Sequence, residues 1–277
     1  YLRRMASRVP RMGKSFYRLG KRKRNAHKPC SISGIKMAKR KTTISAGRLR
    51  KVVLYTAPEP RDGQRARAEK SRATSAAHKA MNDKAARSRL EMLIAANFSG
   101  RDLFLTLTYR DNDLPANRAA AVKNVRSFLA KLRTVRRRRG RVFRYIYTTE
   151  EKHGEARLHH HLIITGTGND VEEIRSLWPH GDMIEFEYVG ARGGDVLSEY
   201  MTKESVQGKP VGAQMWTCSK GLIKPVVKSE IVASNTALVA PSGCRVIEKD
   251  EKQTEFGSYQ YIKYRVPEYC REENGTE

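Results

Sequence analysis

Three consecutive histidines, His159, His160 and His161, have the type and spacing in this sequence that most clearly suggest chemistry. The chain holds only seven histidines in 277 residues, and the surrounding LHHHLIITG (158–166) has the apolar and β-branched content of a strand. Successive strand side chains point to opposite faces, so His159 and His161 share one face and His160 lies on the other. Two imidazoles on one face of a strand can hold a metal ion together. A run of exposed histidines, or core histidines satisfied by neighbours, explains the triplet equally well.

A carboxylate from a neighbouring strand could complete such a site. RVFRYIYTTE (141–150) has the content of a second strand and KHGEA (152–156) that of a hairpin loop, so Glu150 and Glu151 lie across from His159. Alternation places the two glutamates on opposite faces, and only one of them can serve as a ligand. Imidazole combined with carboxylate oxygen suits Mg²⁺ or Mn²⁺, with Zn²⁺ as a further candidate. A solvated turn is the ordinary alternative for paired glutamates.

Tyr200 and Lys203 form a second candidate group. They are three residues apart in DVLSEYMTKES (195–205), which is expected to be helical, so both project from one face. A tyrosine can attack a phosphodiester and hold the phosphate covalently, and Lys203 could hold that phosphate or favour the ionised phenol. The chain has twelve tyrosines, however, and most tyrosines serve in the core or on the surface.

The elements that must position these residues follow from the intervening sequence. An amphipathic helix is expected over 117–134, where the apolar residues that share one face are Ala121, Val125, Phe128, Leu129 and Leu132. The other expected elements are strands over 102–109, 141–150, 158–166 and 182–190 and helices over 170–178 and 195–205. This order predicts an α+β fold, a split β-α-β arrangement whose antiparallel sheet carries helices on one face.

Positive charge is concentrated in the first third of the chain. The formal net charge is +26, and residues 1–100 hold 27 Lys and Arg against five acidic residues. Two basic clusters stand among Gly, Ser and Pro: Lys21, Arg22, Lys23 and Arg24, and then Lys39, Arg40 and Lys41. A polyanion is the expected partner, and nucleic acid is the default because binding to phosphates releases counterions.

Four segments are therefore expected along the chain. They are a basic disordered arm (1–63) with at most a short strand at 51–55, a helical lead-in (64–100), the core (101–205), and a strand-rich C-terminal extension of the core (206–277). No apolar run approaches the roughly 18 residues of a membrane span, and no secretory signal is evident. Four scattered cysteines without a CxxC argue against a disulfide scaffold or a cysteine zinc site. A cytoplasmic protein with no membrane partner is expected.

Three short motifs occur in an order that resembles a known family. FLTLTY (104–109), HHH (159–161) and YMTK (200–203) are similar to the three motifs of the HUH endonucleases, the rolling-circle replication initiators of small single-stranded DNA phages and plasmids. The family's His-hydrophobic-His motif is changed here, because His160 occupies the middle position. Resemblance to phage initiators favours Glu150 as the third metal ligand, whereas resemblance to plant-virus initiators favours Glu151.

The resemblance implies both a fold and an activity. It implies a five-stranded antiparallel sheet related to the RNA-recognition fold, across which single-stranded origin DNA lies, with Thr106 and Thr108 in the DNA-contacting strand. Tyr200 would attack a phosphate activated by a divalent metal, Mg²⁺ or Mn²⁺, leaving a 5′-phosphotyrosine and a 3′-OH primer, and a later transfer would reseal the strand. The sequence has no P-loop motif, so a helicase and a polymerase would come from the host.

Two alternatives remain open from the sequence. A transposase or relaxase of the same type would use the same chemistry, although the long basic arm and the order of histidines before tyrosine favour initiation. A basic, non-catalytic nucleic-acid-binding protein on an RNA-recognition-like sheet would explain the charge. It would leave the His159, His161 and Tyr200 pattern unexplained.

Overall fold

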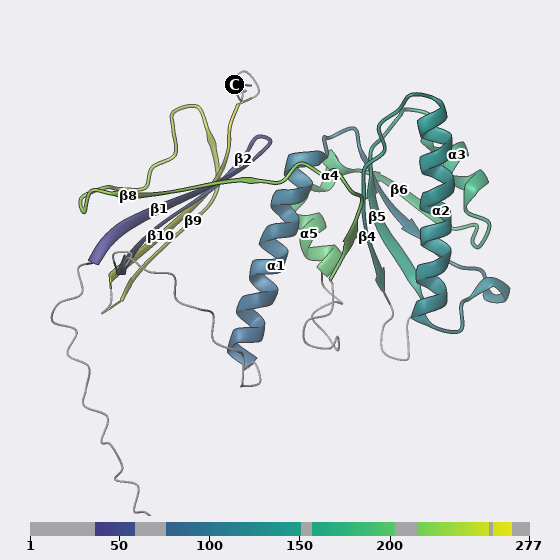
Figure 1. Ribbon diagram of the computed structural model, residues 1–277, viewed down its shortest axis with the longest axis horizontal. Helices are drawn as coiled ribbons and strands as arrows, with labels where there is room; N and C mark the ends of the chain where they lie inside the picture. Colours follow the sequence, from purple (N-terminus) through teal and green to yellow (C-terminus); the bar gives the residue numbers. More distant parts are fainter. Residues whose placement is uncertain (1–36, 59–75, 151–156, 203–214, 255–256, 268–277) are drawn as a thin grey trace, which may run out of the picture. The chain divides into compact units, whose positions relative to one another are not determined.

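The computed structural model describes residues 37–58, 76–150, 157–202, 215–254 and 257–267 (Figure 1). Within these ranges the strands form two five-stranded sheets, and all the strand pairs are antiparallel. Helices pack against the first of these sheets. The predicted α+β class with antiparallel pairing is confirmed.

The first sheet has the strand order β6-β3-β5-β4-β7. Its strands are β3 (Leu103–Leu107), β4 (Tyr145–Glu150), β5 (His159–Ile164), β6 (Ile184–Tyr188) and β7 (Thr217–Cys218). Each strand expected between residues 102 and 190 is therefore present, and β7 adds a short edge. Every residue of β3 is buried, because side chains on both faces of this central strand are covered by helices.

Helices α2 (Arg118–Arg138) and α3 (Asp170–Leu177) cover one face of the first sheet (Figure 1). The Asn117 side chain accepts a hydrogen bond from the backbone N–H of Ala120 at 2.9 Å and so caps the start of α2. The five apolar residues predicted to share one face of this helix are all buried. They pack against alternate side chains of the central strands, such as Leu105 and Leu162.

Helices α1 (Ala76–Asn97) and α5 (Gly194–Thr202) pack against the opposite face. Leu90 and Ile94 of α1 and Leu197 of α5 are buried with Phe104 and Ile163 of the sheet. The short helices α4 (Val189–Arg192) and η1 (Asp111–Asp113) complete the connections. The sequence analysis placed helices on one face only, and the structure adds this second layer. None of the helices in the described part of the chain is long and apolar enough to cross a membrane.

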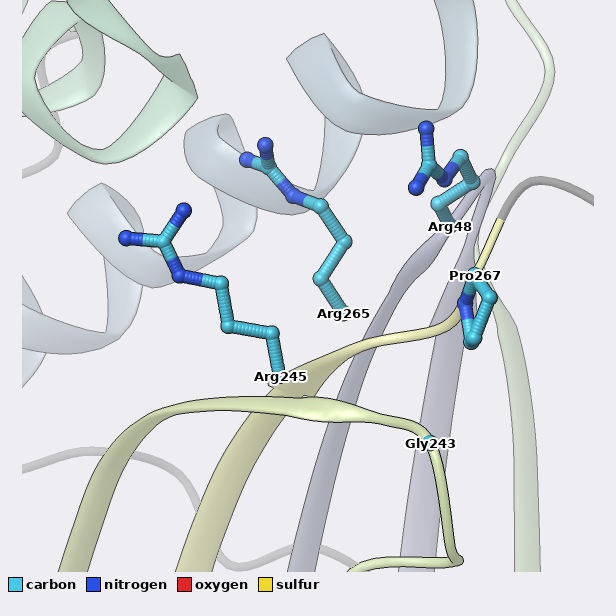
Figure 2. A pocket seen from close by; sticks show the side chains of 5 residues that line it. All are labelled: Arg48, Gly243, Arg245, Arg265 and Pro267. Carbon is cyan, nitrogen blue, oxygen red and sulfur yellow. The ribbon is translucent and has the colours of Figure 1, made fainter.

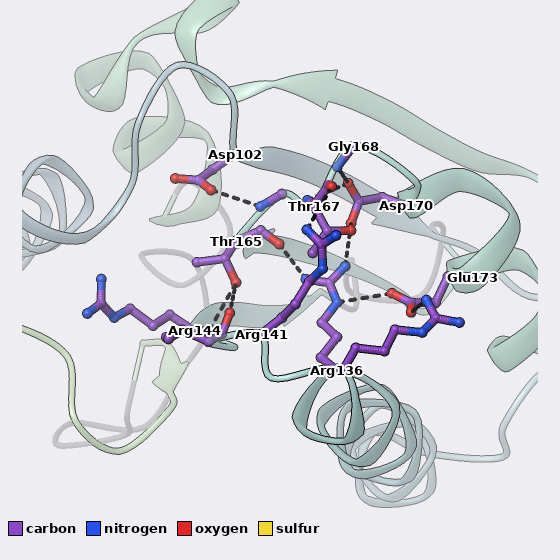
Figure 3. A network of polar contacts seen from close by, with 12 residues as sticks. Asp102, Arg136, Arg141, Arg144, Thr165, Thr167, Gly168, Asp170 and Glu173 are labelled. Atoms are coloured by element: carbon purple, nitrogen blue, oxygen red, sulfur yellow. Dashed lines mark hydrogen bonds and ion pairs between the residues drawn. The ribbon is translucent and has the colours of Figure 1, made fainter.

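A buried arginine ties the end of α2 to α3 and to the end of β5 (Figure 3). Arg136 is 0% exposed, and its Nε donates to Glu173 Oε2 at 3.0 Å. Its other guanidinium nitrogens donate to Asp170 and to the backbone carbonyl of Thr165. The guanidinium also lies over the Phe143 ring, at 5.1 Å from its centroid. These contacts fix the point at which the chain leaves β5.

The second sheet has the strand order β8-β1-β2-β10-β9. Its strands are β1 (Met37–Ala46), β2 (Leu49–Pro58), β8 (Val226–Val232), β9 (Arg245–Thr254) and β10 (Gly257–Arg265). The sequence analysis assigned 37–58 to a disordered arm with at most a short strand at 51–55, and this part of the prediction is wrong. The strands from 226 onward pair with β1 and β2, whereas the sequence analysis took them as an extension of the core sheet.

The hairpin between β1 and β2 explains why this segment folds. Ala46 pairs with Leu49, so Gly47 and Arg48 form a two-residue turn, and Gly47 has a φ of +52°. A Cβ on Gly47 would come within 2.3 Å of the Ala95 carbonyl oxygen, so only glycine fits beside α1. Basic side chains interrupt the apolar alternation of both strands, which is why local composition indicated an arm.

A buried ion-pair group joins the second sheet to α1. Glu91 of α1 accepts from Lys51 Nζ of β2 at 2.5 Å and from Lys263 Nζ of β10 at 3.2 Å. All three side chains are buried, so each charge has an opposite charge in contact with it. Ala46 and Leu49 pack beside this group against Met92 of α1.

Candidate metal centre and nucleophile

The register of β4 and β5 brings a carboxylate and two imidazoles together. Glu150 pairs with His159, and Thr148 pairs with His161, so all four side chains lie on the face covered by α5. Nε2 of His159 lies 3.1 Å from Nε2 of His161. Oε2 of Glu150 lies 3.4 Å from the first of these nitrogens and 3.3 Å from the second. Glu150 is thus the glutamate that the structure brings to the histidines, and Glu151 lies outside the described residues.

These three ligand atoms have the spacing of ligands around one ion. Two ligand atoms at about 2.1 Å from a metal are about 3.0 Å apart at a right angle and about 3.4 Å apart at a tetrahedral angle. The observed separations of 3.1, 3.3 and 3.4 Å fall in this interval. Oε1 of Glu150 is also buried without a hydrogen-bond partner. An acceptor left over in this way fits a carboxylate that binds a cation, so the cluster can hold a divalent metal ion.

Neighbouring polar groups orient both imidazoles. Nδ1 of His159 lies 2.9 Å from the backbone carbonyl of Arg157, and because a carbonyl only accepts, this nitrogen carries the proton. Nδ1 of His161 lies 3.3 Å from the Thr106 hydroxyl. Both Nε2 atoms are thereby turned toward Glu150 with a lone pair available for a metal. Sequence reasoning did not identify Arg157, whose role depends on its carbonyl and has no side-chain signal.

The charge state of the carboxylate suits a cation. Burial favours the neutral form of Glu150, but hydrogen bonds from His159 and His161, together with their positive charge, outweigh burial and lower its pKa to about 2. The carboxylate is therefore ionised at neutral pH.

Tyr200 of α5 lies beside this cluster. Its ring centroid is 4.7 Å from that of His161, with the planes at 69°. Phe104 of β3 stacks on His161 at 5.6 Å and meets the edge of Tyr200 at 5.8 Å. Tyr200 is 39% exposed, whereas His161 is 1% exposed, so the phenol borders solvent while the metal ligand below it is enclosed. Phe104 was not singled out from the sequence, although it lies on the same face of β3 as Thr106.

The middle histidine has a separate, structural environment. His160 points to the other face, where its Nε2 lies 2.8 Å from the Tyr109 hydroxyl and its Nδ1 lies 2.9 Å from the Thr149 hydroxyl. Burial is the main cause that lowers the pKa of His160 to about 3, so its ring is neutral. This neutral, doubly bonded ring packs against Trp178 in place of the hydrophobic residue of the family motif.

The remaining candidate residues have varied environments. Thr108 donates to the Met183 carbonyl at 2.6 Å. In β1, Lys39 donates to the Thr236 carbonyl at 3.2 Å, and Lys41 pairs with Glu230 at 3.3 Å. Their contact with DNA, like that of Thr106 and Arg40, stays a prediction. Other candidates lie outside the described residues: Lys203, Lys21, Arg22, Lys23 and Arg24.

Comparison with known proteins yields one match. Residues 102–205 match a family model described as a replication-associated protein of the ORF2 type. No curated protein and no solved structure matches the chain. The matched segment covers the first sheet from β3 to β6 and includes Glu150, both metal-ligand candidates of β5 and Tyr200. It supports a role in the initiation of replication.

Proposed function

We propose that this chain is a replication-initiator endonuclease of the HUH type, which nicks single-stranded origin DNA with Tyr200 as the nucleophile. The observation that carries the proposal is the 4.7 Å separation between the Tyr200 and His161 rings. An ordinary surface tyrosine has no reason to lie against a buried cluster of two imidazoles and a carboxylate. The family match over the same residues supports this assignment.

The proposed reaction is a phosphoryl transfer to tyrosine. Tyr200 Oη attacks the scissile phosphorus, the bond from phosphorus to the 3′ oxygen breaks, and a 5′-phosphotyrosine forms. The phenol proton leaves to solvent, which reaches this half-exposed side chain, and the 3′ oxygen takes up a proton to become a 3′-OH. His159, His161 and Glu150 would hold Mg²⁺ or Mn²⁺, which would polarise the phosphate and stabilise negative charge in the transition state. Resealing is the reverse attack by a 3′-OH on the phosphotyrosine.

Other residues take supporting roles in the proposal. Phe104 contacts both the His161 and the Tyr200 ring, so it holds the nucleophile against the metal cluster. Lys203 follows one turn after Tyr200 in the sequence and would bind the transferred phosphate. The 3′-OH serves as a primer for a host polymerase, with unwinding by a host helicase.

A covalent-trapping assay tests this function. The full chain is incubated with Mn²⁺ and single-stranded DNA of its own replicon, and the products are run on a denaturing gel. We expect a protein–DNA adduct with the wild-type chain and none with Tyr200→Phe. The matched control is Tyr188→Phe, which removes the hydroxyl of a tyrosine that is 60% exposed at the end of β6 and should leave the adduct unchanged.

Three outcomes are distinguishable. Loss of the adduct in Tyr200→Phe and in His161→Ala, with DNA binding retained, supports the proposal. An adduct that persists in Tyr200→Phe contradicts the assigned nucleophile. Tight binding of single strands without an adduct under any divalent metal favours the non-catalytic binding protein. A transposase or relaxase would cleave its own element's ends in place of a replication origin.

A further inference from the structure

Three arginines converge at one end of the second sheet. Arg48 lies in the β1–β2 turn, Arg245 begins β9 and Arg265 ends β10. Together with Gly243 and Pro267 they line a depression of about 250 Å³. Figure 2 shows the three guanidinium groups extending toward the same side from three separate stretches of chain. All three side chains are exposed.

The positive charge of this depression has no acidic counterpart in its lining. Arg245 and Arg265 pair directly across β9 and β10, so two like charges stand opposite each other, an arrangement that destabilises a sheet. Among the described residues no ion pair involves either side chain. Lysines elsewhere in this sheet do have such partners: Lys41 with Glu230, Lys51 and Lys263 with Glu91, and Lys252 with Asp250.

The local backbone holds the cluster together. Arg48 and Val266 form a reciprocal pair, in which Arg48 Nε donates to the Val266 carbonyl at 2.9 Å and Val266 N–H donates to the Arg48 carbonyl at 2.8 Å. This pair pins the hairpin turn to the end of β10, where Arg265 pairs with Leu49. The arginines therefore stay together although they are about two hundred residues apart in the sequence.

We propose that Arg48, Arg245 and Arg265 bind the phosphodiester backbone of DNA at a site separate from the cleavage centre. A guanidinium offers a planar fork of donors that matches phosphate oxygens, and binding would relieve the repulsion between the opposed arginines. The strands of this sheet and the β1–β2 turn hold 12 Lys and Arg against four acidic residues, so the surroundings also favour a polyanion. The site reads no base sequence, because backbone contacts carry none.

The test compares two double variants of the full chain. Arg245→Gln with Arg265→Gln removes two charges from the depression. Lys228→Gln with Lys249→Gln removes two exposed charges from β8 and β9 of the same sheet and serves as the control. Fluorescence anisotropy with a 30-nucleotide oligothymidylate is measured in EDTA over a range of salt concentrations. Cleavage does not contribute under these conditions, so the outcome is independent of the proposed nuclease activity.

We expect the two variants to differ in salt dependence. Losing two phosphate contacts should reduce the slope of log K against log salt by about 1.4, equivalent to about 25-fold weaker binding at 0.1 M salt. The control should change the slope by less than half as much. Equal slopes for the two variants would overturn the proposal.

A measurement on the unmodified chain removes any dependence on folding of the variants. Arginines are modified with phenylglyoxal with and without the oligothymidylate, and modification is quantified by peptide mass spectrometry. We expect bound DNA to protect Arg245 and Arg265, and protection by inorganic phosphate but not by the oligonucleotide would indicate a small-anion site and contradict the proposal. Full reactivity in both cases also contradicts it.

Discussion

Replacement of Arg136 by methionine probes the contact that closes the first sheet onto its helices. The wild-type guanidinium is fully buried and donates to Glu173, Asp170 and the Thr165 carbonyl (Figure 3). Methionine has a similar length and no charge, so the variant leaves two acidic side chains without their buried cation. The packing volume changes little, which isolates the electrostatic part of the loss.

The expected magnitude follows from what the two carboxylates retain. Asp170 keeps the Thr167 and Gly168 backbone N–H groups at 2.8 and 2.9 Å, and Glu173 keeps Arg139 at 2.9 Å. Breaking a buried ion pair by removing one partner costs about 3–5 kcal/mol, and the retained donors favour about 3 kcal/mol. For a domain of this size that lowers Tm by about 6–12 °C.

Thermal unfolding followed by circular dichroism measures this shift. Arg139→Met is the matched control, because it removes an arginine that is 56% exposed and pairs with the same Glu173. Exposed pairs contribute about 0–1 kcal/mol, so the control should lose no more than about 4 °C. Equal Tm losses in the two variants would refute the reasoning.

Three further predictions address the site, the arm and the second sheet. Thr106→Val removes the hydroxyl beside His161 Nδ1, and it should weaken Mn²⁺ binding about 10–100-fold in calorimetry without removing a ligand; unchanged affinity would contradict its orienting role. Deletion of residues 1–36 should weaken binding of single strands more than cleavage, whereas deletion of 1–60 should also unfold the second sheet because it removes β1 and β2, which circular dichroism would show. Burial raises the pKa of Tyr261, so the folded phenol stays neutral while the unfolded one ionises near pH 10, and stability falls above about pH 10; urea unfolding at pH 9 and 11 should show a smaller fall in Tyr261→Phe.

Much of the candidate site could be predicted because its geometry is local to one hairpin. Period-two alternation alone puts His159 and His161 on one face of β5, and a short loop brings Glu150 opposite them. The choice between Glu150 and Glu151 depended on the register, and only the structure supplies it. The contact between Tyr200 and His161 spans about forty residues and was accessible only through the family resemblance.

The second sheet could not be predicted, because its strands find partners far away in the sequence. β1 pairs with β8 across nearly two hundred residues, and no local pattern encodes such a pairing. Charge also misled the interpretation of particular residues. Lys51 belongs to a basic stretch that indicated disorder, yet it is buried against Glu91. Arg136 begins a run of four arginines that looked like a solvated helix end, yet it is the one inside the core.

The most direct test of the central claim is to identify the residue that becomes bonded to DNA. The adduct formed by the wild-type chain with Mn²⁺ and single-stranded DNA of its own replicon is digested with nuclease and protease and mapped by mass spectrometry. We predict a nucleotide linked through phosphate to Tyr200, and no such peptide when EDTA removes the metal. A nucleotide on any other residue, or an adduct that forms equally well in EDTA, would contradict the account.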